Sequence, residues 1–309
     1  MIAAEHAPYD IRRVPDDVIK HEETLGSKPK FWFSEQGADA RNAPRNLFKR
    51  IRPDTGEDWS ERVAAELARL LGLPHARYDL ATCLGEQGEI VRGVISYSFL
   101  RDGEALVHGN EKLYSSDETY TRDGVWRVYD YSVERVMHVI TGLDAPDPPG
   151  GAARELFVGY LLFDAWIGNT DRHHENWGLV ESASGRWLAP TFDHATSLGR
   201  ELRPEQARLR LQTRDTRQQV DAYLARARSP FYALGDSPGR RPLHPIDAWH
   251  RAARLEAGAA RTWLYRLRSL DAREVAFCLD RVPASHINGW NRALASRILE
   301  INRQRLERD

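Results

Sequence analysis

The chain has 309 residues, 41% of them hydrophobic and 29% charged, so it can bury a substantial core in one large or two modest domains. Its formal net charge of −1 predicts neither direct binding to nucleic acid nor attachment to a membrane, because both rely on a strong positive field. No run approaches the roughly 18 apolar residues that span a bilayer, and the first residues lack the pattern of a secretion signal. Cys83 and Cys278 lie far apart in apolar surroundings, so a reducing, cytoplasmic setting without disulfides is expected.

The chain begins with a pattern of short strands. Residues 31–33 (FWF) and 46–51 (NLFKRI) are separated by polar, Gly- and Pro-containing sequence, which predicts two strands. The turn before them, residues 25–30 (LGSKPK), contains a small residue and two cations, a composition suited to laying backbone N–H groups over phosphates. Ser27 and Lys28 are therefore candidate nucleotide contacts, and a solvated hairpin turn is the alternative.

Lys49 lies in the second of these strands, where strand alternation places it on the same face as Leu47 and Ile51. A lysine between two apolar neighbours either extends to solvent or points into a cleft toward an anion. In kinase folds a strand lysine contacts the nucleotide phosphates and is held by a glutamate on the next helix. Lys49 is therefore a candidate phosphate contact.

Residues 58–71 supply the helix that this arrangement requires. Apolar residues recur there at helical spacing, with Asp58 or Ser60 near the start and a Gly-x-Pro sequence at the end. Glu61 and Glu66 both flank the apolar stripe, so either can pair with Lys49, and we favour Glu61 slightly.

Two further strands are expected, at residues 75–82 and 89–100. The second loses its apolar character at the sequence RDG, and we interpret it as the last strand of a small sheet leading into a linker between two lobes. Backbone groups near Phe99 and Leu100 would then bind the edge of an adenine ring. A core strand followed by a turn is an equally good interpretation.

The rest of the chain is predicted to be mainly helical. Residues 106–110 are loop-like, residues 131–140 predict a helix, and residues 152–167 predict an apolar helix at the centre of the second lobe. Beyond residue 200 we expect a series of Arg-rich amphipathic helices. Arginine runs such as ARLRLQTR are expected to be solvated faces.

A β-hairpin is predicted directly after the apolar helix and the loop that follows it. Residues 177–180 and 186–190 are strand-like and flank the turn-like sequence ESASG. Folding back about this turn places Asn176 opposite Thr191. Asp193 then ends beside Asn176, although the two residues are far apart in sequence.

Asp171 precedes this hairpin in the sequence GNTDRHHEN, five residues before Asn176. Phosphoryl transfer needs a carboxylate that orients the acceptor hydroxyl, together with oxygen ligands that hold Mg²⁺ against nucleotide phosphates. We therefore predict Asp171 as the catalytic base and Asn176 and Asp193 as Mg²⁺ ligands. For any one of these residues, a hydrogen-bonded loop of ordinary turn residues is the alternative.

The set of Lys49, a helix glutamate, Asp171, Asn176 and Asp193 resembles the HipA-like kinases, which are atypical members of the protein kinase-like fold. The sequence GNTDRHHEN is also similar to the DRHxxN loop of phosphoinositide lipid kinases. The resemblance extends from about residue 25 to the last helix and is sharpest at residues 168–196.

This resemblance implies an α+β fold with two lobes, a small β-rich N-lobe at residues 1–102 and a larger helical C-lobe at residues 103–309, with ATP and Mg²⁺ between them. It implies that His173 supports the catalytic loop or a phosphate, and that Ser27 is a candidate for autophosphorylation. The implied substrate is a protein with a Ser or Thr acceptor. An antitoxin partner is also implied, because several HipA-like kinases are toxins controlled by one.

The sequence departs from conventional protein kinases, since Asp171 precedes Arg-His and no Asp-Phe-Gly follows Asp193. Three other functions remain open. A metal-dependent phosphohydrolase would use a cluster of Asp171, Asp193 and the histidines at positions 173, 174 and 194. A catalytically silent kinase-like binding module would keep the fold alone. A small-molecule or lipid kinase would share the fold and differ in substrate.

Overall fold

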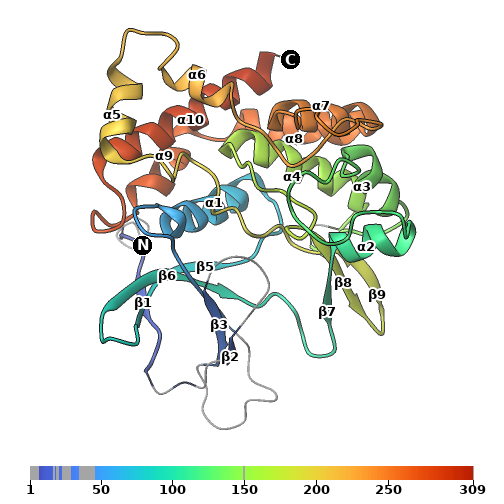
Figure 1. The fold of residues 1–309 in the computed structure, drawn as a ribbon, viewed down its shortest axis with the longest axis horizontal. Helices are drawn as coiled ribbons and strands as arrows, with labels where there is room; N and C mark the ends of the chain where they lie inside the picture. The colour runs from blue at the N-terminus through green and yellow to red at the C-terminus, as the bar shows by residue number, and fades with distance from the viewer. Residues whose placement is uncertain are drawn as a thin grey trace.

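The computed structural model describes residues 7–16, 18, 21–22, 29–34, 46–148 and 150–308. A sheet region occupies one end of the molecule and a helical bulk the other, as Figure 1 shows. Ser27 and Lys28, the two candidates in the predicted phosphate turn, lie outside the described residues. No helix of the described residues is long and apolar enough to cross a membrane.

The described residues at the sheet end form a six-stranded sheet in the order β1-β5-β6-β4-β3-β2. The strands are β1 (Ile11–Arg13), β2 (His21–Glu22), β3 (Lys30–Phe33), β4 (Asn46–Arg50), β5 (Tyr78–Leu84) and β6 (Ile90–Tyr97). β1 pairs with β5 in parallel and the other pairs are antiparallel. Phe33, Phe48 and Ile95 form part of a small apolar core on this sheet. The strands predicted around Lys49 are therefore confirmed.

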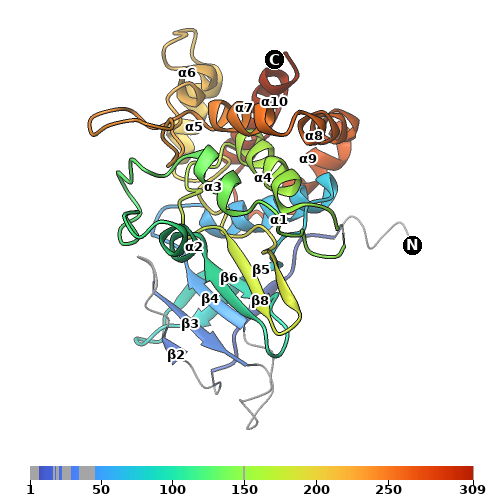
Figure 2. The ribbon, with the colours of Figure 1, turned by 90° about the vertical axis from the view of Figure 1, so that its right-hand side faces the viewer.

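Helix α1 (Glu57–Leu71) lies between this sheet and the other helices, as Figures 1 and 2 both show. Val63, Leu67 and Leu71 are buried, at the helical spacing that predicted them. The helix begins after Gly56 without a side-chain cap, because glycine has no side chain that could accept a hydrogen bond. Asp58, in the first turn, accepts hydrogen bonds from the backbone N–H of Trp59 (2.8 Å) and from Arg92 (2.7 Å). Gly72 ends it in the left-handed conformation, with a φ of 78°.

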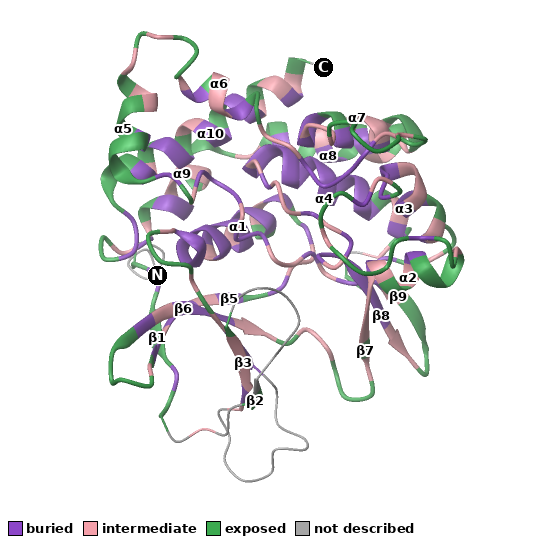
Figure 3. Ribbon diagram, viewed as in Figure 1, coloured by how far each residue is buried: buried purple, intermediate pink, exposed green. Residues whose placement is uncertain are grey.

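The helical bulk is built around α4 (Ala153–Ile167), which is almost wholly buried (Figure 3) and packs against several of the other helices. This central position of the apolar helix confirms the prediction for residues 152–167. The other helices are α2 (Gly109–Ser116), α3 (Val133–Val139), α5 (Pro204–Gln212), α6 (Val220–Leu224), α7 (Pro245–Leu255), α8 (Ala257–Ser269), α9 (Ala272–Asp280) and α10 (Gly289–Arg308).

The expectation of a loop at residues 106–110 is wrong. Ala105–His108 forms strand β7, and α2 begins at the next residue. β7 pairs with β8 (Gly178–Ser182), which pairs with β9 (Gly185–Leu188), so that the described residues here form a three-stranded sheet. A short segment becomes a strand in this case because a distant strand offers its backbone groups, a tertiary effect that local composition does not reveal.

We expect the same substitution to have opposite effects at two glycines. Gly72→Ala should lower the free energy of unfolding by about 1 kcal/mol, because a Cβ at a φ of 78° clashes with the backbone. Gly258→Ala, in the first turn of α8, should raise it by roughly 0.5–1 kcal/mol, because nothing lies within 4 Å of the added atom and alanine loses less entropy in a helix. Urea unfolding monitored by circular dichroism measures both changes. Equal effects at the two positions would contradict this account of Gly72.

Candidate functional site

The predicted hairpin is present with the predicted register. Leu179 pairs with Leu188 and Glu181 with Arg186, and the turn lies at Ser182–Gly185. Continuing this register outward along the two chains places Asn176 opposite Thr191. The hairpin therefore returns the chain to the loop before β8, as the sequence predicted.

The loop that joins α4 to the hairpin holds Asp171 and Asn176 together. The Asn176 side-chain Nδ2 donates a hydrogen bond to the carbonyl oxygen of Asp171 at 2.7 Å. The Asp171 backbone N–H donates to Asn169 Oδ1 at 3.1 Å, and Thr196 Oγ1 donates to Asp171 Oδ2 at 3.3 Å. The Asp171 side chain remains 27% exposed, so an acceptor hydroxyl in solvent can reach it.

Asp193 and Lys49 meet across the junction between the sheet and the helical bulk. Lys49 Nζ lies 3.3 Å from Asp193 Oδ2 and 5.7 Å from the centre of the Tyr78 ring. Tyr78 Oη accepts a hydrogen bond from the Asp193 backbone N–H at 3.1 Å. Burial opposes the charge on Lys49, but the Asp193 carboxylate outweighs it and raises the lysine pKa above its usual range. The Asp193 carboxylate therefore favours the charged form of Lys49.

The two glutamates considered as partners of Lys49 have different surroundings. The buried Glu61 Oε1 accepts a hydrogen bond from the backbone N–H of His194 at 2.7 Å, and the charge of Glu61 contributes to the raised Lys49 pKa. Glu66 instead pairs with Arg62 at 2.6 Å and with Arg69 at 3.0 Å, on another face of α1. The structure thus brings Glu61, rather than Glu66, to the predicted metal-binding end of the hairpin.

The first turns of α1 also hold the segment that follows Asp193. Besides the contact of Glu61 with His194, Ser60 Oγ donates to the carbonyl oxygen of Ser197 at 3.0 Å. Glu57 Oε1 forms an ion pair with the guanidinium of Arg200 at 3.0 Å. These three contacts are made by residues 194, 197 and 200, and they hold this segment along the first turns of α1.

Arg172 joins the catalytic loop to the hairpin from inside the core. It is 1% exposed, and its guanidinium forms a two-point ion pair with Asp164 on α4, at 2.7 and 2.8 Å. The same guanidinium donates to the carbonyl oxygens of Asn176 (2.6 Å) and Phe192 (3.2 Å). Arg172 therefore fixes Asn176 relative to the residue that precedes Asp193.

The three histidines considered for a metal cluster lie in different environments. His194 Nε2 lies 2.9 Å from Arg172 and 2.8 Å from Thr191 Oγ1, and burial together with the Arg172 charge keeps the His194 pKa well below its usual value. His174 Nδ1 lies 2.7 Å from Tyr120 Oη, and burial lowers the His174 pKa to about 4.

His173 is closest to the predicted base, with Nε2 at 4.0 Å from Asp171 Oδ1, and burial lowers its pKa as well. Within the described ranges, no group of three or more His, Cys, Asp or Glu side chains is arranged to hold a metal. A two-metal phosphohydrolase centre is therefore disfavoured, because two of its histidines are committed to buried hydrogen bonds.

The segment just after β6 approaches the site through an aromatic contact. The Phe99 ring stacks on Phe192, with centroids 5.9 Å apart, and Phe192 immediately precedes Asp193. The Leu100 backbone N–H donates to Ser98 Oγ at 3.2 Å in an exposed turn. Phe99 and Leu100 thus lie where the sheet meets the helical bulk, as the linker interpretation requires.

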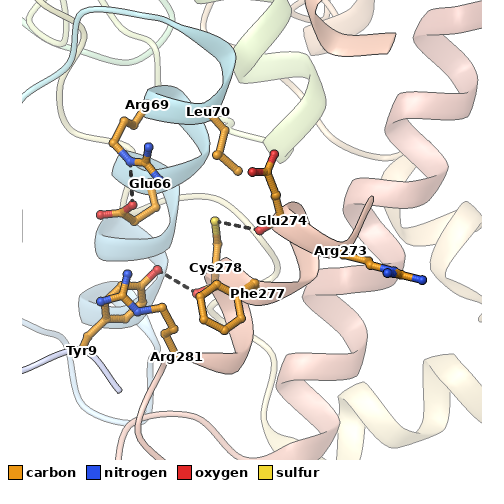
Figure 4. A pocket seen from close by; sticks show the side chains of 9 residues that line it. All are labelled: Tyr9, Glu66, Arg69, Leu70, Arg273, Glu274, Phe277, Cys278 and Arg281. Atoms are coloured by element: carbon orange, nitrogen blue, oxygen red, sulfur yellow. Dashed lines mark hydrogen bonds and ion pairs between the residues drawn. The ribbon is translucent and has the colours of Figure 1, made fainter. Parts of the chain in front are cut away.

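A cavity of about 330 Å³ on another side of α1 shares no residue with this cluster. It lies between α1 and α9 and is lined by charged and aromatic side chains, among them Tyr9, Glu66, Arg69 and Arg281 (Figure 4). Tyr9 Oη donates to the carbonyl oxygen of Cys278 at 3.0 Å, and Glu66 and Arg69 are paired with each other. Tyr9 therefore contacts α9, whereas the pair of Glu66 and Arg69 lies within α1.

Sequence reasoning missed several residues that build the site. Asp164 carried a signal, because it is the only charged residue between Leu156 and Ile167 in an otherwise apolar helix. A buried charge needs a partner, and the arginine after Asp171 was the nearest candidate in sequence. Tyr78 and Thr196 carried no comparable signal, because strand tyrosines and loop threonines are ordinary residues.

Together these features define a kinase-like α+β protein with a small sheet region and a helical bulk. The model of the HipA-like C-terminal domain family matches residues 24–263, so the chain belongs to this family. A comparison with curated proteins finds no match.

Two solved structures show the same fold. One is the Helicobacter pylori proinflammatory kinase CtkA, with a TM-score of 0.67, 17% identity and 93% of each chain covered. The other is a chain of the Shewanella oneidensis MR-1 toxin–antitoxin complex of HipA, HipB and operator DNA. It has a TM-score of 0.54 and 16% identity, and the alignment covers 96% of this chain and 67% of that one. The predicted fold class and the family resemblance are confirmed.

Removing the buried partner of Arg172 should be costly. Asp164→Asn leaves a guanidinium charge uncompensated in the core, and we expect the free energy of unfolding to fall by about 3–5 kcal/mol. Glu300→Gln is the matched control, because it makes the same chemical change in a solvent-exposed pair with Arg297 and should cost less than about 1 kcal/mol. Urea titration of both variants gives the comparison. A small effect of Asp164→Asn would show that the pair does not hold the loop.

Proposed function

We propose that this protein is an ATP- and Mg²⁺-dependent kinase that phosphorylates a serine or threonine of a protein substrate. The observation that carries the proposal is the meeting of Lys49 with Asp193 at 3.3 Å beside a loop that joins Asp171 to Asn176. A cation for phosphates, oxygen ligands for a metal and a reachable carboxylate are the groups that phosphoryl transfer requires. Membership of the HipA-like family supports the same function.

Asp171 has the proposed role of the base. In the transfer, the acceptor oxygen forms a bond to the γ-phosphorus of ATP, the bond to the β,γ-bridging oxygen breaks, and ADP leaves. The proton of the acceptor hydroxyl goes to the Asp171 carboxylate. The hydrogen bond from Thr196 to Asp171 Oδ2 orients this group, and the nearby His173, with its lowered pKa, supports the loop as a neutral side chain.

Asn176 and Asp193 have the proposed role of Mg²⁺ ligands, and the donor set fits that ion. Both side chains offer oxygen, which hard cations prefer, and Mg²⁺ is commonly held by one or two carboxylates together with substrate phosphates. Asn176 uses Nδ2 toward Asp171, which leaves its Oδ1 as the remaining polar atom of the side chain. Asp193 is 34% exposed and thus reachable by a nucleotide-bound cation.

Lys49 would contact the phosphates of ATP, and Glu61 would fix the position of α1 relative to Lys49 and the hairpin. Phe99 and Leu100, just beyond the end of β6, are the proposed contacts of the adenine ring. Ser27 and Lys28 remain the proposed phosphate-turn contacts from the sequence alone. Bound ATP would supply the phosphoryl group, while these residues bind and orient it.

An antitoxin partner is a further part of the proposal. One solved structure of the same fold is a complex of HipA with HipB and operator DNA, which supports a partner of the antitoxin kind. We propose that contact with nucleic acid is made by such a partner, because the chain has a formal net charge of −1. The kinase assignment does not depend on this partner.

The base assignment is tested by Asp171→Ala. We expect the initial rate of phosphate transfer, measured with radiolabelled ATP and Mg²⁺ and mapped by mass spectrometry, to fall by about 10²–10⁴-fold, because removing a general base costs that much. The thermal midpoint should change little, since the Asp171 side chain is partly exposed. Asp280→Ala, an exposed carboxylate on α9, is the control and should keep the wild-type rate. Undiminished transfer by Asp171→Ala would refute the proposed mechanism.

The metal assignment is tested by Asp193→Ala. We expect this variant to lose about tenfold or more of its nucleotide affinity in Mg²⁺ and to lose little in EDTA, because its carboxylate acts through the cation. Isothermal titration with a non-hydrolysable ATP analogue measures both affinities. The Asp280→Ala control should keep the wild-type response to Mg²⁺. An equal loss with and without Mg²⁺ would mean that Asp193 does not act through the metal.

A further inference from the structure

A cavity of about 370 Å³ opens beside Asp171, between the catalytic loop and the segment around α6. Thr170 and Thr196 line one side of it, and Arg226 and Arg228, just beyond α6, line another. Thr196 is the residue that donates to Asp171 Oδ2, and the Thr170 backbone N–H donates to the carbonyl oxygen of Thr196 at 3.3 Å. The cavity therefore begins one residue away from the proposed base.

The position of this cavity suits the acceptor rather than the nucleotide. Lys49, the proposed phosphate contact, and Asp193, a proposed Mg²⁺ ligand, lie together, whereas the hydrogen bond from Thr196 to Asp171 leads into the cavity. Phosphoryl transfer places the attacking and leaving oxygens roughly in line on opposite sides of the phosphorus. With the nucleotide on the Lys49 side, an acceptor hydroxyl at Asp171 would approach from the other side, and the cavity beside Asp171 offers room there for the residues next to the acceptor.

The charge of the cavity is positive. Arg200, Arg226 and Arg228 line it, against one carboxylate, that of Glu201. Glu201 already accepts a hydrogen bond from the Tyr223 hydroxyl at 2.5 Å. The cavity therefore has an excess of guanidinium groups over carboxylates.

The two arginines beyond α6 contact only carbonyl groups within the described part of the chain. Arg226 donates to the carbonyl oxygen of Arg217 at 3.5 Å, and Arg228 donates to those of Ala225 and Ala227 at 3.1 and 2.6 Å. Neither forms an ion pair with a described carboxylate. Their charges are therefore available to an external anion.

Arg200 connects the cavity to the catalytic loop. Its guanidinium Nη2 donates a hydrogen bond to Thr196 Oγ1 at 3.4 Å, and its Nη1 forms an ion pair with Glu57. The Nε of Arg200 is buried and has no hydrogen-bond partner among the described residues. An unsatisfied guanidinium N–H is costly to bury, so a ligand with an acceptor oxygen would stabilise this arrangement.

We propose that this cavity binds an acidic side chain of the protein substrate, a few residues from the serine or threonine that receives the phosphate. A carboxylate matches the fork of donors on a guanidinium, which makes arginine the favoured residue for such recognition. This specificity rests on the proposed function, because it assigns the substrate class of the same site. Arg226 and Arg228 are specificity-determining residues in this proposal, and Asp171 keeps the chemical step.

The test uses three fluorescein-labelled peptides that share one serine acceptor and have flanking aspartates, alanines or lysines. Binding to the full chain without nucleotide is measured by fluorescence polarisation, and phosphorylation is measured separately with Mg²⁺ and ATP. We expect the wild type to bind the aspartate peptide about tenfold more tightly than the alanine peptide, a difference of about 1.4 kcal/mol. Because the contact is ionic and partly exposed, this preference should shrink at high salt.

The variant Arg226→Glu/Arg228→Glu should lose the preference for aspartate, raising KM for the acidic peptide by about tenfold while kcat changes little. Arg226→Glu alone guards against unfolding, because Arg226 is exposed. The control is Arg254→Glu/Arg261→Glu, which makes the same change in net charge at exposed positions of α7 and α8 outside the cavity. A preference that survives in the cavity variants, or that is lost equally in the control, would overturn the proposal.

The two proposals can fail separately. Phosphorylation of all three peptides at equal rates, abolished by Asp171→Ala, would keep the kinase and reject the acidic substrate. Arginine-dependent binding of the aspartate peptide without any phosphate transfer would keep the acidic-peptide site and reject the kinase. Binding of phosphatidylcholine vesicles containing phosphatidylinositol phosphate through Arg226 and Arg228, in place of the peptides, would reject a peptide ligand.

Discussion

The candidate site depends on one buried ion pair, between Arg172 and Asp164. Two charges in a dry core are stable only when the pair is close and the remaining donors are satisfied. Arg172 meets both conditions, because two of its three guanidinium nitrogens contact Asp164, one of these also contacts Thr191 Oγ1, and the third reaches the backbone carbonyl of Asn176. Helix α4 thus fixes the position of the two chain segments that carry Asn176 and Asp193, the proposed Mg²⁺ ligands. Arg172 thereby supports, from inside the core, the segments that carry the partly exposed side chains of Asp171 and Asp193.

Helix α1 makes a second connection, from the sheet side. Its first turns hold residues 194–200 through Glu61, Ser60 and Glu57, and its apolar stripe packs into the main core. The position of the segment after Asp193 therefore depends on the position of α1. One consequence is that the Lys49–Asp193 pair and the cavity near Arg200 share a mechanical support. A displacement of α1 would alter the proposed metal end and the proposed substrate end together.

Charge is distributed unevenly around Asp171. The side of the site toward the hairpin has the side-chain oxygens of Asn176 and Asp193 beside a single lysine, which suits the proposed Mg²⁺ between protein and phosphates. The side toward α6 has arginines whose described contacts are mostly carbonyl groups, which suits an anion. Such a separation would give each of the two proposed reactants a distinct electrostatic environment, even though the whole chain is close to neutral. Net charge alone would have concealed this difference, because opposite charges elsewhere cancel the local excess.

The sequence by itself determined the local elements and the residue types of the site. The hairpin, its register, the strand of Lys49, helix α1 and the apolar helix α4 follow from periodicity and turn chemistry, which act over a few residues. The interval from Asp171 to Asn176 and the family resemblance could likewise be recognised from the sequence. Tertiary structure alone decided which distant groups meet. Residues 105–108 form a strand because they pair with β8. Glu61, rather than Glu66, contacts the segment after the hairpin, and Asp164 pairs with Arg172. The tertiary structure also gathers arginines from residues 200–228 around one cavity beside the loop. These outcomes depend on contacts between segments far apart in sequence, whose energies arise only after the core has packed.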